Sequence, residues 1–350
     1  MSIAPSRPPV PLPELEELMD AAYVVRLPLR LRFRGLTERE VLLLDGPHGW
    51  GEFGPFTEYD DAESARWLAA GVESGWGSWP EPVRRSVPVN ATVPAISAQQ
   101  VPGVLARFPG STTVKVKVAE AGQTVEDDVA RVAAVVDVLG ADLARLRVDA
   151  NGRWTVAEAR DALRRLRDAA GAAVFEYAEQ PCATVPELAE LRIALAADGV
   201  EVPIAADESV RKADDPLAVA IAGAADVVVV KVAPLGGVLS ALVIADQLRA
   251  EHGLPAVVSS ALDTSVGIGA GVALAAALPD LSYACGLGTV TLFESDVSAA
   301  PLVPRDGAID VRRGVVDPDR MAALAAAPER ATWWRERLER CYQVLAAGFR

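Results

Sequence analysis

The feature that most constrains the fold is a strand-then-helix pattern that repeats along the chain from residue 87 onward. Segments rich in Val and Ala lie at 87–93, 112–118, 144–150, 173–179, 202–207, 226–232, 255–260 and 282–288. Between them lie Ala-rich amphipathic stretches that open with Thr or Val-Pro and stop at Gly, as helices do. Strands that alternate with helices at this spacing predict parallel βαβ units.

Eight such units over about 200 residues favour a closed (β/α)8 barrel of the TIM type, in the α/β class. An open doubly wound sheet is the alternative architecture. It has less support, because no GxGxxG motif follows the first strand to mark a dinucleotide site.

The regions that flank the repeats have a different pattern. Residues 22–54 contain apolar strand-like runs with a Gly-Pro turn, and a helix is expected near 60–73. The last fifty residues predict a short strand and two helices. We therefore expect residues 1–86 to form an α+β capping domain, residues 87–300 to form the catalytic barrel, and residues 301–350 to pack back onto the cap.

The net charge and the cysteines of the chain limit the classes of partner that it can bind and indicate the compartment in which it works. A formal charge of −14 and a pI near 4.7 argue against binding to nucleic acid or to anionic membranes. Three widely spaced cysteines fit neither a disulfide framework nor a CxxC metal site, which is typical of a reducing compartment. The sequence shows neither a signal peptide nor about 20 uninterrupted apolar residues. We expect a cytoplasmic monomer whose partner is a small-molecule carboxylate.

Polar side chains lie near the C-terminal ends of six successive predicted strands. They are Lys117, Asp149, Glu179, Asp207, Lys231 and Ser260. In a (β/α)8 barrel the C-terminal ends of the strands form the active-site mouth, and a charge inside an apolar strand must be paired or ligated. The pattern therefore predicts an enzyme with its active site at this end of the barrel.

Three of these residues suggest a metal site. Asp149, Glu179 and Asp207 come from adjacent strands, so their carboxylates converge and need a cation between them. A ligand set of oxygen atoms without His or Cys suits a hard divalent ion. We expect Mg²⁺, with Mn²⁺ able to substitute, although isolated salt-bridged acids would explain each residue alone.

The lysines predict the chemistry. Lys117 and Lys231 lie on strands four apart in a ring of eight, so they face each other across the pocket. This arrangement suits removal of a proton next to a carboxylate, with the metal stabilising the enediolate. Lys115 lies on the same face of its strand as Lys117, and its charge should lower the pKa of Lys117.

The motifs "KVK", "VDAN", "AEQP", "ADES" and "VVVVKVAPLGG" resemble the enolase superfamily, in its muconate-lactonizing-enzyme-like subgroup. Within that subgroup, "GEFGPFTEY", "SSALDTSVGIG" and "GLGT" resemble the members that catalyse one particular reaction. The implied reaction is that of a carbon–oxygen lyase of menaquinone biosynthesis. It dehydrates 2-succinyl-6-hydroxy-2,4-cyclohexadiene-1-carboxylate to 2-succinylbenzoate.

The resemblance also implies a role for each residue. Lys117 would abstract the α-proton and return it to the leaving hydroxyl, and Lys231 would stabilise the enediolate. Asp149, Glu179 and Asp207 would bind the metal. Substrate contacts would come from Asn151, Ser260 and the backbone N–H groups of Gly286 and Gly288, and Phe53 and Phe56 would close the pocket or pack in the cap core.

Alternative functions remain open at this point. An N-succinylamino acid racemase would use the same lysines and metal. A Schiff-base aldolase could use Lys231 as its nucleophile, but three convergent carboxylates would then have no purpose. A non-catalytic binding barrel is the third alternative, and the role of Asp263 is undefined.

Overall fold

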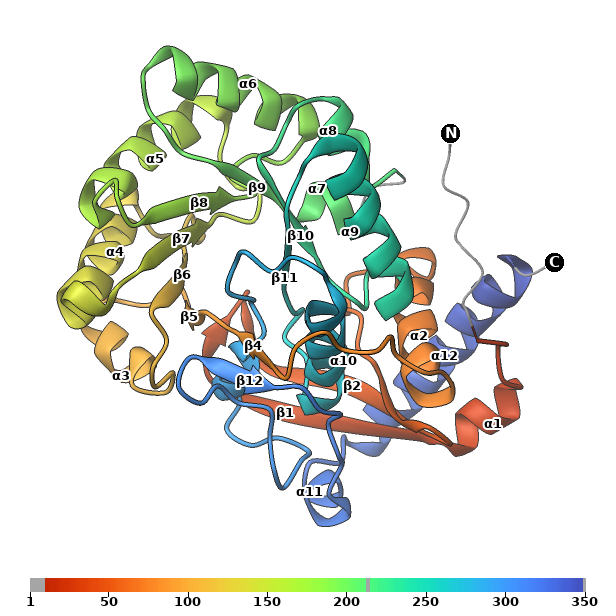
Figure 1. Ribbon diagram of the computed structural model, residues 1–350. Helices are drawn as coiled ribbons and strands as arrows, with labels where there is room; N and C mark the ends of the chain where they lie inside the picture. Colours follow the sequence, from red (N-terminus) through yellow and green to blue (C-terminus); the bar gives the residue numbers. More distant parts are fainter. Residues whose placement is uncertain (1–9, 212–214, 349–350) are drawn as a thin grey trace.

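The parallel sheet of the predicted barrel is present in the computed structural model, which describes residues 10–211 and 215–348. The outermost residues of the first and last predicted segments lie outside this description. Seven strands follow one another in space in the order β11-β10-β9-β8-β7-β6-β5. They are β5 (Ala91–Val93), β6 (Thr113–Lys117), β7 (Arg145–Asp149), β8 (Phe175–Glu179), β9 (Ile204–Ala206), β10 (Val227–Val230) and β11 (Ala256–Val258). The sheet curls on itself, as Figure 1 shows.

The eighth barrel position is filled by an irregular segment instead of a full strand. Residues 282–288 contribute single bridges, Ser259 with Gly286 and Val89 with Cys285. The Gly286 N–H donates to the carbonyl of Val258, and the Cys285 N–H donates to Pro88. The barrel prediction is thus confirmed as an architecture, while the eighth strand is reduced to a short closing contact.

The first predicted strand, 87–93, divides into two parts. Its second half is β5, in the barrel. Its first half belongs to β4 (Ser86–Pro88), which pairs antiparallel with β12 (Ala308–Asp310). The strand is split because the C-terminal part of the chain returns to pair beside it.

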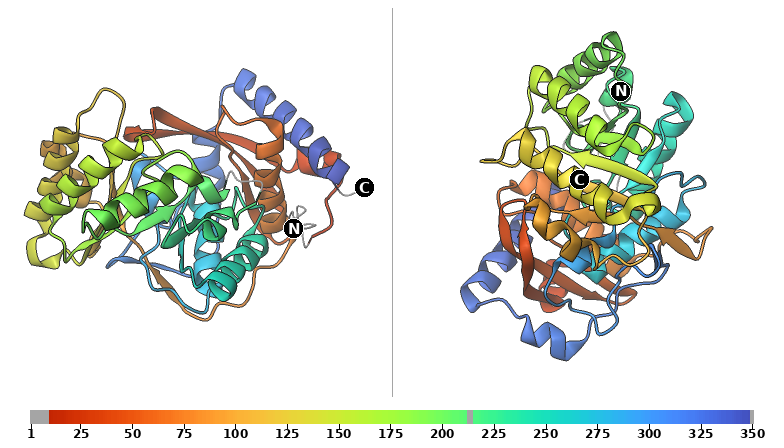
Figure 2. Two further views of the ribbon diagram at one scale, coloured as in Figure 1. Left: turned by 90° about the horizontal axis from the view of Figure 1, so that it is seen from above. Right: turned by 90° about the vertical axis from the view of Figure 1, so that its left-hand side faces the viewer.

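Helices cover the outside of the sheet (Figures 1 and 2). They include α3 (Val101–Leu105), α4 (Val125–Leu139), α5 (Val156–Ala170), α6 (Val185–Ala197), α7 (Glu208–Arg211), α8 (Ala218–Ile221), α9 (Val238–His252) and α10 (Ser265–Ala277). The threonines predicted to open helices do so: Thr124, Thr155 and Thr184 each form a capping box with the acidic residue three positions later. None of the helices in the described part of the chain is long and apolar enough to cross a bilayer.

A second layer of structure lies beside the barrel. An antiparallel sheet consists of β1 (Ala22–Phe33), β2 (Leu36–Gly46) and β3 (Gly49–Phe53), and α2 (Asp61–Trp76) packs on it. The termini add α1 (Leu15–Asp20), α11 (Pro318–Ala323) and α12 (Pro328–Gly348). Phe53 meets Trp334 of α12 edge-to-face at 5.8 Å, so the C-terminal helix shares the apolar core of this layer.

Two buried glutamates join this layer to the barrel. Glu52 of β3 accepts hydrogen bonds from the N–H groups of Thr264 and Gly267 at the start of α10. Glu73 of α2 accepts from Val238 and Leu239 at the start of α9. Side-chain oxygens at a helix N-terminus satisfy N–H groups that have no partner within the helix, so both contacts fix the cap over the barrel.

Candidate active site

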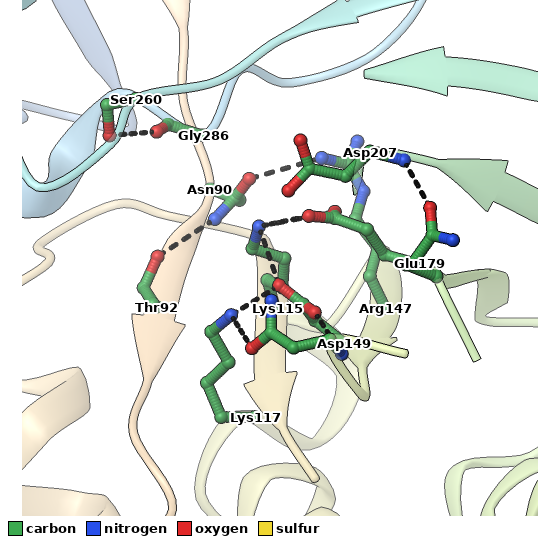
Figure 3. Close-up of polar contacts among 12 residues, drawn as sticks. Asn90, Thr92, Lys115, Lys117, Arg147, Asp149, Glu179, Asp207, Ser260 and Gly286 are labelled. Carbon is green, nitrogen blue, oxygen red and sulfur yellow. Dashed lines mark hydrogen bonds and ion pairs between the residues drawn. The ribbon is translucent and has the colours of Figure 1, made fainter. Parts of the chain in front are cut away.

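The charged residues at the mouth are brought together by the register of three neighbouring strands. Lys117 on β6 lies beside Asp149 on β7, and Asp149 lies beside Glu179 on β8. Asp207 follows β9 and Lys231 follows β10 directly. Figure 3 shows Lys115, Lys117, Asp149, Glu179 and Asp207 gathered on one side of the barrel mouth.

Each carboxylate is paired with an ammonium group. Lys115 Nζ donates to both oxygens of Glu179 at 3.0 and 3.2 Å and lies 3.3 Å from Asp149 Oδ2. Lys117 Nζ donates to Asp149 Oδ2 at 2.5 Å and Lys231 Nζ donates to Asp207 Oδ2 at 2.5 Å. All three carboxylates are almost fully buried and have lost their solvation by water. The ammonium groups compensate their negative charges instead.

The carboxylates still repel one another. Burial, and then the charge of Asp149, raise the pKa of Glu179 to about 7, although Lys115 opposes this shift. Burial also favours the neutral form of Asp207, but Lys231 and Arg211 outweigh it and lower its pKa to about 2. Lys117 and Lys115 in the same way overcome burial and lower the pKa of Asp149. Such crowding of buried acids is typical of a cation site.

The pKa of Lys117 is lowered, as the sequence predicts, but the main cause is different. Burial is the largest contribution, and the positive charges of Lys115 and Arg34 add to it against the attraction of Asp149. The pKa of Lys115 itself is raised, since Glu179 and Asp149 outweigh its burial. The two lysines of the "KVK" strand therefore differ in how readily they give up a proton.

The three carboxylates fit a divalent cation by their chemistry, but they are turned towards separate ammonium groups. Within residues 10–211 and 215–348, no three His, Cys, Asp or Glu side chains already stand in the arrangement of a metal site. Oδ1 of Asp207 is buried and accepts no hydrogen bond, although Arg211 Nε lies 3.2 Å away. An acceptor left without a hydrogen bond in a cluster of hard oxygen ligands is what a divalent ion would satisfy.

A pocket lies in front of these pairs. Lys231 lines it together with Lys117, four strands away in the sheet, so the opposed lysines are both at the cavity. The free volume is about 30 Å³. This is far less than the roughly 300 Å³ of a ligand pocket, so the cavity has to widen for a substrate to enter.

The residues predicted to contact the substrate differ in whether they line the pocket. Asn151, with φ of 48°, accepts a hydrogen bond from Lys117 Nζ at 2.8 Å through its side-chain oxygen and lines the pocket. Ser260 also lines it, with its hydroxyl donating to Gly286 O. The Gly286 N–H is used in barrel closure, where it donates to the carbonyl of Val258. Gly288 is not among the residues that line the pocket, so its contact with the substrate stays a prediction.

Of the two roles expected for Phe53 and Phe56, the structure shows the packing role in the cap core. Phe53 and Phe56 are buried in the core of the cap. Phe33 and Arg34, at the tip of the β1–β2 hairpin, line the pocket in their place, and the Lys117 ammonium lies 5.5 Å from the centroid of the Phe33 ring. No local pattern marks these two residues, because their position depends on how the hairpin lies over the barrel.

The small number of lysines in the sequence, and their positions, are a signal that would have identified the site. The chain contains four lysines, at positions 115, 117, 212 and 231, and the other basic residues are arginines. Three of the four are at this mouth. Lysine, unlike arginine, can be deprotonated in a buried site, so its restriction to the pocket indicates a chemical need.

Comparisons with known proteins agree with this geometry. The model of the family described as "Enolase C-terminal domain-like" matches residues 103–315, and the "Enolase N-terminal domain-like" model matches residues 24–75. The o-succinylbenzoate synthase of Mycobacterium tuberculosis (strain H37Rv) is 55% identical over 97% of this chain and 98% of its own. That of Mycobacterium leprae is 55% identical over 95% of both chains.

Solved structures show the same fold at lower identity. Muconate lactonizing enzyme from Pseudomonas fluorescens, complexed with muconolactone, superposes with a TM-score of 0.70 at 22% identity, over 87% of this chain and 98% of that one. N-succinyl Arg/Lys racemase from Bacillus cereus has a TM-score of 0.67 at 19% identity, over 87% and 97%. At these identities the likeness concerns the fold alone.

Proposed function

The chain belongs to the enolase superfamily, and we propose that within it the chain works as an o-succinylbenzoate synthase. The observation that carries this proposal is the identity of 55% with curated o-succinylbenzoate synthases over nearly the whole chain. The reaction is the loss of water from 2-succinyl-6-hydroxy-2,4-cyclohexadiene-1-carboxylate to give 2-succinylbenzoate. It makes the enzyme a carbon–oxygen lyase of menaquinone biosynthesis.

Members of this superfamily generally use a divalent metal, and we propose that the metal here is Mg²⁺, held by Asp149, Glu179 and Asp207. The support is the buried set of oxygen ligands and the unsatisfied Oδ1 of Asp207. When bound, the ion would stabilise the negative charge that develops on the substrate carboxylate. The ammonium groups of Lys115, Lys117 and Lys231 neutralise these carboxylates in its place in the present arrangement.

We propose Lys117 as the base that removes the proton from C1 of the ring. Its nitrogen borders the pocket, and burial lowers its pKa so that the neutral form is accessible. The electron pair of the broken C–H bond moves to the carboxylate as an enediolate. Its return expels the C6 hydroxyl, which takes the proton from Lys117 and leaves as water.

Lys231 and Lys115 would act by charge. Lys231 lines the opposite side of the pocket, where its ammonium can stabilise the enediolate. Its nitrogen donates to Asp207 at 2.5 Å. A Schiff-base reaction at Lys231 would leave the three buried carboxylates without a purpose, which disfavours that alternative. Lys115 also lines the pocket, and its hydrogen bonds to Glu179 would hold that carboxylate in position.

The charge, the buried free cysteines and the pocket also support the other expectations. We propose that the enzyme acts in the cytoplasm on a small-molecule carboxylate, while its monomeric state stays a prediction from the sequence.

The proposal is tested by following the aromatic product by ultraviolet absorbance. Wild-type protein is assayed with Mg²⁺, after EDTA treatment, and after Mg²⁺ is restored. Product that disappears with EDTA and returns with Mg²⁺ is the expected result. If folded, Mg²⁺-supplied protein gives no product but exchanges the α-proton of N-succinylamino acids with deuterium, the racemase alternative is correct instead.

A further inference from the structure

The tip of the β1–β2 hairpin has a conformation that does not suit the residue found there. Arg34 and Gly35 connect the two strands, and Phe33 pairs with Leu36 across the turn. The φ angles are 51° at Arg34 and 79° at Gly35. A two-residue hairpin with positive φ at both positions favours Asn-Gly or Gly-Gly, because a Cβ is strained there and Asn offsets the strain by local hydrogen bonds. An arginine at this position calls for an explanation beyond the turn itself.

The side chain of Arg34 reaches the active-site pocket. It lines the cavity with Lys117, Lys231 and Ser260. Its guanidinium carbon lies 4.5 Å from the centroid of the Phe56 ring, and Phe56 is buried in the cap. Stacking on a fixed ring holds the guanidinium plane and leaves its N–H edge available.

Arg34 also differs from the other cations of the pocket in its charge balance. Lys115 is paired with Glu179, Lys117 with Asp149 and Lys231 with Asp207. Arg34 forms no ion pair with any residue in the described ranges. A cation at a pocket without an internal carboxylate partner is suited to a carboxylate of the ligand.

A second carboxylate of the substrate would need such a partner. The first carboxylate belongs at the acidic cluster, where the metal ligands are proposed. The Gly286 N–H is already bonded to the carbonyl of Val258, and Gly288 lies outside the pocket lining. Binding of the succinyl arm by the Gly286 N–H would therefore break a barrel contact, whereas Arg34 already lines the cavity.

We propose that Arg34 binds the remote carboxylate of the succinyl group and so selects substrates with two carboxylates. The inference rests on the proposed function, which supplies a substrate with a succinyl arm. The planar guanidinium would form two parallel N–H···O bonds to this carboxylate. Arg34 then acts as a specificity residue that the cap places over a barrel active site.

The test uses Arg34→Asn, which keeps a residue suited to the turn, and Arg32→Gln as the control. Arg32 is an exposed arginine of the same hairpin that lies outside the pocket lining. Binding of 2-succinylbenzoate and of 2-butanoylbenzoate, which lacks the remote carboxylate, is measured by calorimetry with Mg²⁺ on the full chain. The thermal midpoint of each protein is recorded as well.

The wild type and Arg32→Gln are expected to bind 2-succinylbenzoate about ten- to a hundredfold more tightly than 2-butanoylbenzoate, the range for hydrogen bonds to charged groups. Arg34→Asn is expected to bind the two compounds equally, with unchanged affinity for 2-butanoylbenzoate. Its thermal midpoint should be at least that of the wild type, because Asn suits the turn. A purely structural role for Arg34 predicts a lower midpoint and retained discrimination.

The proposal is overturned if Arg34→Asn still discriminates between the two compounds, if it weakens both equally, or if the wild type does not discriminate. If the wild type binds neither compound, the measurement is repeated with N-succinyl- and N-butanoylphenylglycine. If the wild type discriminates between these two compounds and Arg34→Asn does not, the proposed role of Arg34 is supported. The proposed dehydratase activity is then contradicted. Absence of binding to all four compounds contradicts both.

Discussion

Lys115 and Lys117 lie two residues apart on β6, yet their ammonium groups have different surroundings. Lys115 is held between Glu179 and Asp149, and its pKa is raised. Lys117 is at the pocket, where burial lowers its pKa despite Asp149. One lysine therefore stays charged while its neighbour can act as a base.

Removal of Lys115 should change the pH dependence of the reaction. In Lys115→Met, Lys117 loses a repelling charge and the carboxylates of Asp149 and Glu179 lose a counter-ion. Both effects favour charged Lys117 and raise its pKa. We expect the acidic limb of the kcat/KM profile to move to higher pH, as measured by product absorbance across a pH series.

The control for this experiment is Arg145→Met, which removes an exposed positive charge from the neighbouring strand β7. Its profile should match the wild type. An acidic limb in Lys115→Met that stays at the wild-type pH would contradict the influence of Lys115 on the base.

Residues that end strands could be predicted from the sequence, whereas residues of the cap could not. Asp149 and Glu179 were identifiable because parallel strands bring their C-terminal ends to one edge. Phe33 and Arg34 belong to another part of the chain, and only the packing of two layers brings them to the pocket. The dominant effect of burial on Lys117 likewise depends on that packing.

At the scale of elements, a buried arginine helps to close the barrel. Arg147 of β7 donates to Asn90 Oδ1 at 3.1 Å and to the carbonyl of Ala284 at 2.6 Å, and it pairs with Glu176. Asn90 precedes β5 and Ala284 belongs to the irregular eighth segment, so Arg147 connects three parts of the barrel. Its guanidinium carbon also lies 4.7 Å from the centroid of the Tyr177 ring. Figure 3 shows the contact with Asn90.

We expect Arg147→Met to destabilise the protein by about 3 kcal/mol, because buried acceptors lose their partner. Arg145→Met, two residues earlier on the same strand, should change stability by less than about 1 kcal/mol, since the Arg145 side chain is exposed and its nitrogen lies 3.9 Å from Glu176. Urea denaturation of both variants measures the difference. Equal stability of the two variants would show that Arg147 has no special part in closure.

The sequence identified seven barrel strands more accurately than the eighth. Residues 282–288 contain Gly286 and Gly288, which weaken a regular strand, and the segment keeps only single bridges to its neighbours. The division of 87–93 was also beyond sequence reasoning, because β4 pairs with β12 from a distant part of the chain. Helix starts, in contrast, were predictable from the local capping threonines.

At the scale of the whole molecule, we propose that residues 1–86 and 301–350 work as one cap on a barrel formed by residues 87–300. The shared core of Phe53 and Trp334 supports this division. The cap supplies Arg34 to the pocket, and the Glu52 and Glu73 contacts hold it there.

The Glu52 contact predicts a pH-dependent stability. Burial, and then the charge of Asp263, raise the pKa of Glu52 from its usual value of 4.5 to about 8, against the hydrogen bonds from Thr264 and Gly267 and the charge of Arg39. The folded protein therefore holds a proton that the unfolded chain loses above about pH 4.5. This stabilisation is complete below pH 4.5 and decreases as the pH rises through about 8.

Replacement of Glu52 by Gln should remove this pH dependence. The thermal midpoint of the wild type is expected to fall between about pH 6 and pH 9 more than that of Glu52→Gln. Glu81→Gln, at an exposed position, serves as the control and should follow the wild type. The same decrease in Glu52→Gln as in the wild type would exclude Glu52 as the source.

The central claim, that Lys117 removes the proton, is tested most directly by comparing Lys117→Ala with the wild type in the presence of Mg²⁺. Turnover is followed by the absorbance of 2-succinylbenzoate, and binding of the same compound is measured by calorimetry. The expected result is a fall in kcat of at least about 10²- to 10⁴-fold, the usual contribution of a general base, with product affinity changed only a few-fold. A variant that keeps kcat within about tenfold of the wild type would contradict the assignment of Lys117 as the base.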